Sequence, residues 1–426
     1  MHITILALGS RGDVLPYIAL AQALYKAGHC VRMATYENFK GVVSGLGLDF
    51  YPVRGDAQAI MGSVSGKEMT AAGQNVLRTA RAILRTFGPA ARDYAADLAG
   101  IARLETDALI NQLPGGLFGF DLAEKLGVAH ILASVIPLAR TRERPMLAFP
   151  QGFAWLPGYS LLTYRLAEQI VWQAFRPTIN RWRKTVLGLP ATPFWGYFDA
   201  LEQAKTPILN GFSEHIVTRP ADWGKHIHIT GYWFPEEPEW QPPPELRRFI
   251  EAGEPPVYLS FGSMPVGKEA SVAQVILEGM RLSGQRIVLG LGWGGIANLT
   301  LPENVFPIDY APYAWLFPPL AGVIHHGGSG TTAFGLRAGV PGLVIPLVFD
   351  QFYWGKRLAQ LGVGLEPLPF KRLSAATLAD GIQRLASDGS LRQRAALLGE
   401  KIRAENGLQR AVEIVETILG SPRGAP

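Results

Sequence analysis

Short apolar runs alternate with segments of helical periodicity along both halves of this 426-residue chain. The apolar runs predict strands, and the amphipathic segments between them predict helices. We expect strands at residues 2–8, 31–35, 256–262, 285–290, 305–309, 322–325 and 343–349, and helices at 15–27, 270–283, 331–338 and 352–361. Alternation of this kind is typical of βα units with parallel strands. The sequence therefore predicts an α/β fold with doubly wound sheets.

A proline-rich, acidic stretch divides this alternation into two parts. It reads Pro235-Glu-Glu-Pro-Glu-Trp-Gln-Pro-Pro-Pro244 and lacks apolar periodicity, so it predicts a stiff linker. A chain of this length is also too long for one ordinary core. We therefore expect a first domain at 1–234, a linker at 235–248, a second domain at 249–403 and a C-terminal segment at 404–426. Ligands of such sheets bind at the carboxyl ends of the strands, which places the expected site in a cleft between the domains.

Composition limits the classes of function. The net charge of +5 is small and is not gathered into a basic run, which argues against nucleic-acid binding. The single cysteine, Cys30, excludes an internal disulfide, fits a reducing compartment and is expected to be buried. The start of the chain lacks a secretory pattern, and no segment reaches the ~18 apolar residues of a membrane span. We expect a cytoplasmic protein, either soluble or peripheral at a membrane.

The stretch Val323-Ile-His-His-Gly-Gly-Ser-Gly-Thr-Thr332 predicts an anion site. An apolar strand meets a glycine-rich turn and then the start of a helix, where free backbone N–H groups and the helix dipole attract negative charge. His326 stands at the mouth of this turn, where its ring can donate a hydrogen bond to a phosphate oxygen. The stretch therefore indicates phosphate binding.

Two further groups of polar or aromatic residues end neighbouring predicted strands. Asp350 and Gln351 follow the apolar run 342–349, and a carboxylate beside an amide is suited to gripping several hydroxyls. Ser263 follows the first strand of the second half, while Tyr310-Ala311-Pro-Tyr313 offers aromatic faces on which a base can stack. Phosphate, base and polyol together indicate a nucleotide-sugar site.

The first predicted strand is followed by the turn Gly9-Ser-Arg-Gly-Asp13. The spacing departs from the G-x-G-x-x-G fingerprint, which argues against a nicotinamide enzyme. Asp13 has two interpretations: it caps the next helix, with Pro16 in the first turn, or it faces the cleft as a general base. Both interpretations predict similar positions, and the sequence leaves both open.

Other residues carry weaker signals. His325 and His326 diverge at a strand end, and His226 and His228 have no third ligand nearby, so we expect no metal site. The segment 146–189 carries Trp155, Trp172 and Trp182 among aliphatic residues, which fits either helical core or an acceptor pocket or membrane-touching face. The segment 76–98 resembles a basic amphipathic helix broken by Gly88-Pro89, and a solvated helix face is the favoured interpretation.

The chain resembles family 1 glycosyltransferases of the GT-B fold over almost its whole length. The motifs that carry the resemblance are Gly9–Asp13, Ser260-Phe-Gly-Ser263, His325–Thr332, Arg337-Ala-Gly-Val-Pro341 and Asp350-Gln351. Within that family it is most similar to the sterol 3β-glucosyltransferases and their bacterial antibiotic-aglycone relatives. The stretches Gln169–Pro177, Asn180–Arg183 and Asp350–Trp354 point toward the sterol branch.

The resemblance implies two Rossmann-like domains facing across a cleft, the first binding the acceptor and the second the nucleotide sugar. A C-terminal helix would cross back to the first domain. Asp13 would be the catalytic base, His326 would act on the diphosphate, and Asp350 and Gln351 would hold the sugar. The other implied contacts are Ser263, Gly328, Ser329, Gly330 and Thr331 for the diphosphate, Tyr310, Ala311 and Tyr313 for the base and ribose, and Arg11, Trp155, Trp172, Phe349 and Trp354 for the acceptor.

Two departures from the family pattern affect these expectations. Phe334 stands where plant members place a glutamate for the ribose hydroxyls, so ribose recognition is rearranged and uracil versus thymine stays open. The N-terminal histidine base of many members has no counterpart in Gly9–Asp13, which favours Asp13 by elimination.

The implied reaction is an inverting, metal-independent transfer of a hexose, taken as glucose from UDP-glucose, to a sterol or similar apolar alcohol. No cofactor is expected beyond this co-substrate. One alternative is a transferase that decorates a polyketide, carotenoid, glycolipid or glycopeptide from a UDP- or dTDP-sugar. A second alternative is a non-catalytic nucleotide-sugar-binding or peripheral membrane protein.

Overall fold

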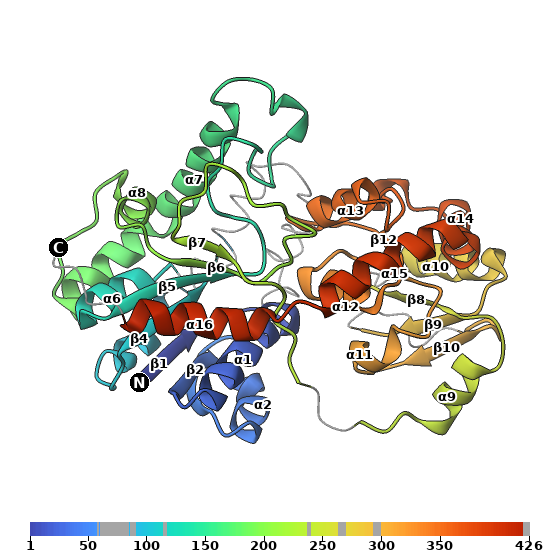
Figure 1. Cartoon of the computed structure of the whole chain (residues 1–426), viewed down its shortest axis with the longest axis horizontal. Coiled ribbons are helices and arrows are strands. Elements are labelled where there is room, and N and C mark those ends of the chain that lie inside the picture. The colour runs from blue at the N-terminus through green and yellow to red at the C-terminus, as the bar shows by residue number, and fades with distance from the viewer. Residues whose placement is uncertain are drawn as a thin grey trace. The chain divides into compact units, whose positions relative to one another are not determined.

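The computed structural model divides into two units (Figure 1). Unit 1 comprises Met1–Pro235 and Asn406–Pro426, and unit 2 comprises Glu236–Glu405. The structure describes residues 1–57, 59, 85, 91–113, 117–236, 240–262, 270–292 and 300–420.

Unit 1 is built on a seven-stranded sheet in the order β3-β2-β1-β4-β5-β6-β7, and its neighbouring strands in the described ranges pair in parallel. The direction of winding reverses between β1 and β4, which are neighbours although three strands apart in the chain. The strands are β1 (His2–Leu6), β2 (Cys30–Tyr36), β3 (Asp49–Val53), β4 (Ala108–Gln112), β5 (Ala129–Ser134), β6 (Ile208–Asn210) and β7 (Ile227–Ile229).

Helices cover both faces of this sheet, because neighbouring strand residues point to opposite sides. In β4, Ile110 belongs to the cluster that contains α1 and α16, while Leu109 belongs to the cluster that contains α6 and α7. The helices are α1 (Arg11–Lys26), α2 (Lys40–Gly45), α6 (Gly119–Leu126), α7 (Tyr159–Trp182), α8 (Gly196–Gln203) and α16 (Gly407–Gly420).

The C-terminal helix α16 returns to unit 1, as the fold class predicted. Ala411, Val412 and Val415 on this helix are buried in the same cluster as Ile18 and Leu24 of α1. These apolar contacts make α16 part of the unit 1 core, although 170 residues of unit 2 precede it in the chain.

Unit 2 carries a five-stranded sheet in the order β10-β9-β8-β11-β12, and its described strands also pair in parallel. Here the winding reverses between β8 and β11. The strands are β8 (Val257–Ser260), β9 (Ile287–Gly290), β10 (Val305–Ile308), β11 (Gly322–His325) and β12 (Gly342–Val344). The helices are α9 (Pro244–Glu251), α10 (Ala270–Ser283), α11 (Tyr313–Leu316), α12 (Ser329–Ala338), α13 (Gln351–Gln360), α14 (Ala375–Ser387) and α15 (Gly389–Arg403). The two parallel sheets confirm the predicted fold class.

Three local expectations were wrong. The strand expected over 343–349 ends at Val344, and the helix expected from residue 15 already begins at Arg11. Cys30 is exposed at the first residue of β2, directly after the turn at Gly28. In addition, α9 begins at Pro244, inside the range expected as linker, since proline fits the first helical turn and Leu246 and Ile250 are buried.

No helix in the described ranges combines the length and the apolar character that crossing a bilayer requires.

Candidate active site

The reversal point of unit 2 brings two predicted phosphate-binding loops together. β8 and β11 pair in parallel, with Ser260 opposite His325, so the loops that follow them leave the same edge of the sheet. In doubly wound sheets this reversal point is where ligands bind. Gly262 of the first loop, at φ +57°, lies so close to the second that an ideal Cβ there would be 3.1 Å from Cε1 of His326. A side chain at position 262 would therefore crowd the His326 ring.

His326 has a half-buried ring whose hydrogen-bonding capacity is not fully used. Its Nδ1 atom is buried and has no hydrogen-bond partner among the described residues. Burial lowers the pKa of His326 to about 4, so the imidazole is neutral at pH 7. A neutral imidazole still carries one N–H donor, and a ligand that satisfies this ring would remove the cost of an unpaired buried polar atom.

His325 has a different role from its neighbour. Its ring stands at 85° to that of His326, with 6.4 Å between the ring centres. Its Nδ1 accepts a hydrogen bond from the Gly327 backbone N–H at 3.1 Å, and burial lowers its pKa to about 3. His325 thus shapes the glycine turn from inside the sheet.

The N-terminus of α12 is open toward the same loop. Gly328 is the N-cap residue, and no side chain among the described residues caps this end. The Thr332 hydroxyl donates back to the Gly328 carbonyl at 2.9 Å. The first-turn N–H groups, those of Ser329, Gly330 and Thr331, have no intrahelical acceptor, which is the usual arrangement for binding phosphate.

The backbone of Gly327, in this turn, packs closely against the start of α13. It has φ +95°, and an ideal Cβ there would lie 2.6 Å from Val344 Cγ1 and 3.0 Å from the Gln351 carbonyl oxygen. Only glycine permits this approach. The predicted diphosphate and sugar residues are therefore neighbours within unit 2.

Gln351 and Asp350 are held in place by bonds to their own loop. The Gln351 Oε1 atom accepts from the backbone N–H groups of Leu347 and Val348 at 2.8 and 3.0 Å. The Trp354 indole N–H donates to Asp350 Oδ2 at 2.8 Å. Phe349, which lies between Val348 and Asp350, has φ +47°, a strained conformation for a bulky residue. These side-chain hydrogen bonds of Gln351 and Asp350 take the place of the strand predicted for residues 345–349, and they fix where α13 begins.

The residues predicted for the nucleoside lie in different environments. The Tyr310 ring is exposed, whereas the Tyr313 ring stacks on Phe317 with 4.4 Å between centres and meets Phe334 edge-on. Ala311 is buried. Tyr310 therefore presents the more accessible aromatic face, and the α12 surface at Phe334 is apolar. Ser263 lies outside the described residues.

Asp13 lies at the reversal point of unit 1, in the first turn of α1, the helix that follows β1. The carboxylate occupies the third position of α1 and accepts hydrogen bonds from the Ser10 backbone N–H and the Ser10 hydroxyl, both at 2.8 Å. Ser10, not Asp13, is the N-cap residue. Both bonds end on Oδ2, and within the described ranges no hydrogen bond to Oδ1 is present. One oxygen thus supports the helix start, while the other is available for proton transfer.

The surroundings of Asp13 make it more basic than an ordinary carboxylate. Burial raises its pKa above the usual 3.8, and this effect outweighs the opposing hydrogen bonds from Ser10. Burial also raises the pKa of Tyr36 to about 12, with a contribution from the Asp13 charge. The phenol is therefore neutral, and the Asp13 carboxylate is the ionisable group that titrates first in this pair.

Gln112 is a site residue that the sequence did not reveal. It ends β4, the neighbour of β1, and is almost fully buried. Its Oε1 accepts from the Leu8 backbone N–H at 2.7 Å, and its Nε2 donates to the Asp13 backbone carbonyl at 3.2 Å. Gln112 therefore links the loop after β1 to the first turn of α1, which carries Asp13.

The predicted acceptor residues do not form one cluster within either unit. Arg11 is exposed at the start of α1, and Trp155 is exposed before α7. Trp172 is buried in the unit 1 core, where it stacks on Tyr197. Phe349 and Trp354 lie at the start of α13 in unit 2. Their role in acceptor binding stays a prediction.

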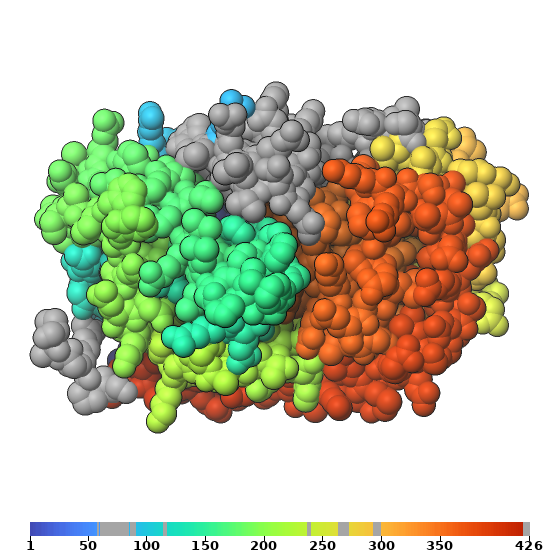
Figure 2. Space-filling model, turned by 90° about the horizontal axis from the view of Figure 1, so that it is seen from above, coloured from blue at the N-terminus to red at the C-terminus, as the bar shows by residue number. Residues whose placement is uncertain are grey.

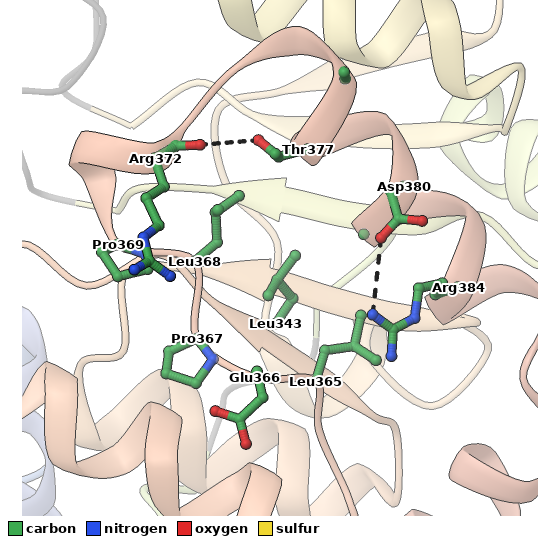
Figure 3. Close-up of a pocket in the computed structure, with 12 residues that line it drawn as sticks. Leu343, Leu365, Glu366, Pro367, Leu368, Pro369, Arg372, Thr377, Asp380 and Arg384 are labelled. Carbon is green, nitrogen blue, oxygen red and sulfur yellow. Dashed lines mark hydrogen bonds and ion pairs between the residues drawn. The ribbon is translucent and has the colours of Figure 1, made fainter.

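A separate pocket of about 380 Å³ lies in unit 2 (Figure 3). Leucine and proline side chains line it, and an Asp380–Arg384 ion pair of 3.8 Å stands at its side. None of the predicted site residues lines this pocket. Within the described ranges, no three His, Cys, Asp or Glu side chains are grouped as a metal site.

Two family models match the chain. The model described as the glycosyltransferase family 28 N-terminal domain matches residues 3–143. The model described as the erythromycin biosynthesis protein CIII-like C-terminal domain matches residues 286–418. The first match includes β1 and β4 of unit 1, and the second includes β11 and α12 of unit 2.

Curated relatives match nearly the full chain. The sterol 3-beta-glucosyltransferase UGT80B1 of Arabidopsis thaliana is 35% identical over 97% of this chain and 67% of its own length. The sterol 3-beta-glucosyltransferase of Neurospora crassa is 34% identical over 97% of this chain but only 27% of its own length. The chain thus spans about two thirds of the plant relative and about a quarter of the fungal one.

Solved structures share the fold. The glycosyltransferase of kitacinnamycin superposes with a TM-score of 0.70 at 18% identity, covering 98% of this chain and 99% of that one. The glycosyltransferase VinC in complex with DTDP superposes with a TM-score of 0.68 at 20% identity, covering 100% of both chains.

Proposed function

The chain belongs to the family of the sterol 3-beta-glucosyltransferases, and from that premise we propose that it transfers glucose from UDP-glucose to the hydroxyl of a sterol or a similar apolar alcohol. The observation that carries this proposal is that each unit has residues of suitable chemistry at its own strand-reversal point. In unit 2 the uncapped N-terminus of α12 would bind the diphosphate, close to Asp350 and Gln351 for the sugar hydroxyls. In unit 1 the carboxylate of Asp13 has a raised pKa.

We propose that the donor binds unit 2 along the loop after β11. The diphosphate would accept hydrogen bonds from the His326 ring and from the N–H groups of Ser329, Gly330 and Thr331, with Gly328 permitting close approach. Asp350 and the Gln351 amide would hold the sugar hydroxyls, and the exposed Tyr310 ring would stack on the base. Ser263 is proposed as a further phosphate contact on the strength of the family motif.

The proposed chemistry is a direct displacement with inversion at the anomeric carbon. The acceptor oxygen bonds to this carbon as the bond from the carbon to the diphosphate oxygen breaks. Asp13 takes the proton of the acceptor hydroxyl, and UDP leaves with its charge stabilised by the N-terminus of α12 and His326. Because those groups supply the electrostatic stabilisation, we propose that no divalent metal is required.

The donor and metal parts of this proposal share one experiment. UDP-glucose and dTDP-glucose are compared as donors for sterol glucosylation, with and without EDTA. We expect preference for UDP-glucose and unchanged turnover in EDTA. Loss of turnover in EDTA that Mg²⁺ restores would overturn metal independence, and preference for dTDP-glucose would overturn the donor assignment.

The pH dependence of the reaction follows from the raised pKa of Asp13. The base must be ionised, so kcat/KM is expected to fall as the pH drops through this pKa, with a midpoint above the usual 3.8. Protonation of His326, with its pKa of about 4, adds positive charge beside the diphosphate and is not expected to weaken donor binding. A pH–rate profile at limiting sterol checks this prediction. A rate that stays constant down to pH 4 would contradict it.

Gln112 is expected to be a positioning residue for the base. Gln112→Met removes both of its hydrogen bonds at similar volume, so we expect kcat to fall about tenfold or more while the KM for UDP-glucose stays unchanged. Gln112→Glu keeps an acceptor for the Leu8 N–H but places a negative charge near Asp13, which raises the pKa of Asp13. The acid limb of the pH–rate profile is therefore expected at higher pH in this variant than in the wild type.

A glutamine of unit 2 serves as a control for the loss of a long-range side-chain hydrogen bond. Gln383 in unit 2 likewise donates across the fold, to the Ser283 carbonyl at 3.2 Å. Gln383→Met is expected to leave kcat and the pH profile unchanged. If both methionine variants lose the same activity, or if Gln112→Glu leaves the acid limb in place, Gln112 does not position the base.

A further inference from the structure

An exposed apolar surface lies before and along the first turns of α7. We define the apolar tip by its five exposed side chains: Phe153, Trp155, Leu156, Leu162 and Leu166. The Trp155 side chain is 74% exposed and that of Leu162 is 52% exposed. Five large apolar side chains exposed within one short segment form a patch of the kind that marks an interaction site.

The apolar tip stands away from the sheet of unit 1. Figure 1 shows the segment before α7 beyond the outer end of that helix, and Figure 2 shows its teal-green atoms at the surface. Local bonds hold the loop in shape: Leu156 N–H donates to the Phe153 carbonyl and Tyr159 N–H to the Leu156 carbonyl, at 3.0 and 3.1 Å. The Gln151 amide donates to the carbonyls of Met146 and Phe149. These backbone groups are already satisfied within the protein.

Arginines outnumber acids around the apolar tip. Residues 145–164 contain no charged side chain, and Arg165, exposed between Leu162 and Leu166, is the first charge after them. Arg142, Glu143 and Arg144 precede them, and Glu143 accepts a hydrogen bond from the Ala221 backbone N–H at 2.6 Å. The nearby acid Glu168 pairs with Arg140 at 2.6 Å, and Arg140 also pairs with Asp199 at 2.8 Å. An apolar, tryptophan-bearing surface flanked by arginine complements a layer of anionic headgroups above hydrocarbon.

We propose that the apolar tip docks on a bilayer that contains anionic phospholipid, with Trp155, Phe153 and Leu156 in the headgroup region and Arg165 on the lipid phosphates. Insertion costs little, because the loop is preformed and its turns satisfy one another's backbone groups. The benefit for turnover rests on the proposed function: a sterol acceptor resides in such a bilayer, and docking brings unit 1 to it.

Binding is tested first, without donor or acceptor. The purified chain is floated with phosphatidylcholine–phosphatidylserine vesicles and with pure phosphatidylcholine vesicles. We expect binding to the anionic vesicles that weakens in high salt. The variants Phe153→Ser with Leu156→Ser, and Arg165→Glu, are expected to weaken it about tenfold or more.

A matched leucine serves as the control. Leu162→Ser is expected to weaken vesicle binding, whereas Leu397→Ser on α15, where the side chain is 54% exposed, is expected to leave it unchanged. Equal vesicle binding by wild type and all apolar-tip variants would overturn the proposal. So would concentration-dependent self-association in sedimentation that the same variants abolish, because the surface would then bind a second copy.

Turnover separates this proposal from the proposed function. With sterol in anionic vesicles, the Phe153→Ser/Leu156→Ser variant is expected to lose turnover, whereas with sterol delivered in detergent it is expected to match the wild type. Vesicle binding without turnover on sterol in either form would contradict the sterol function and leave the docking surface standing. Normal turnover of the variant on vesicle-embedded sterol would overturn the docking surface and leave the function standing.

Discussion

Asp13→Asn is expected to abolish turnover while leaving UDP binding unchanged. An amide cannot accept the proton of the acceptor hydroxyl, so the loss is at least the ~10²–10⁴-fold that general base catalysis contributes. Asp13 belongs to unit 1, whereas the proposed UDP contacts belong to unit 2. Single-turnover rates and calorimetric titration with UDP measure the two effects separately.

A second variant distinguishes the base from the helix cap. An asparagine oxygen can still accept from the Ser10 N–H and hydroxyl, so Asp13→Asn is expected to keep the melting temperature. Asp13→Ala removes those bonds and is expected to cost about 1 kcal/mol of stability as well as turnover. If Asp13→Asn retains turnover while Asp13→Ala loses it together with stability, Asp13 is a cap and not the base.

His326→Ala is expected to weaken UDP binding and to remove turnover. The ring's hydrogen bond to a charged phosphate is worth about 1.5–3 kcal/mol, which corresponds to roughly a ten- to hundredfold weaker affinity. Calorimetry with UDP measures the affinity, and sterol-dependent UDP release measures the turnover.

The matched substitutions for His326 sharpen this result. His326→Gln retains an N–H donor and is expected to recover part of the UDP affinity. His228→Ala changes a half-buried histidine of unit 1 and is expected to leave UDP affinity unchanged. UDP affinity that is the same in wild type and His326→Ala would rule out the phosphate contact.

Much of the fold could be predicted because buried parallel strands are continuous apolar runs. The strand at β11 and the helix at α10 have the predicted bounds, and both sheets are parallel as expected. The positions of His326 directly after β11 and of Asp13 shortly after β1 followed from the same pattern, since each apolar run stops at a glycine turn. What these residues do in the reaction stays a prediction.

Two features of the candidate site depend on contacts that local patterns do not contain. Gln112 reads as the end of a buried strand, and its role arises from bonds to Leu8 and Asp13, about a hundred residues earlier. The run after Val344 is apolar enough for a strand, yet Pro346 lacks a donor and the Gln351 side chain takes the N–H groups of Leu347 and Val348. The loop conformation is decided by that side chain.

Two other differences had signals in the sequence. Ser10-Arg-Gly-Asp13 has the spacing of a capping box, which predicts a helix that begins at Arg11. Tyr313 and Phe317 are four residues apart, the helical spacing at which aromatic rings meet, and the structure stacks them. That stack leaves Tyr310 as the more accessible ring for a base.

The central claim is sterol-dependent transfer of glucose, and one measurement tests it most directly. The purified protein is incubated with UDP-glucose, with and without a dispersed sterol such as cholesterol, while UDP release and product mass are followed. We predict UDP release that depends on the sterol and a product heavier than the sterol by one hexose. Binding of UDP-glucose without any sterol-dependent release or glucosylated sterol would contradict the account.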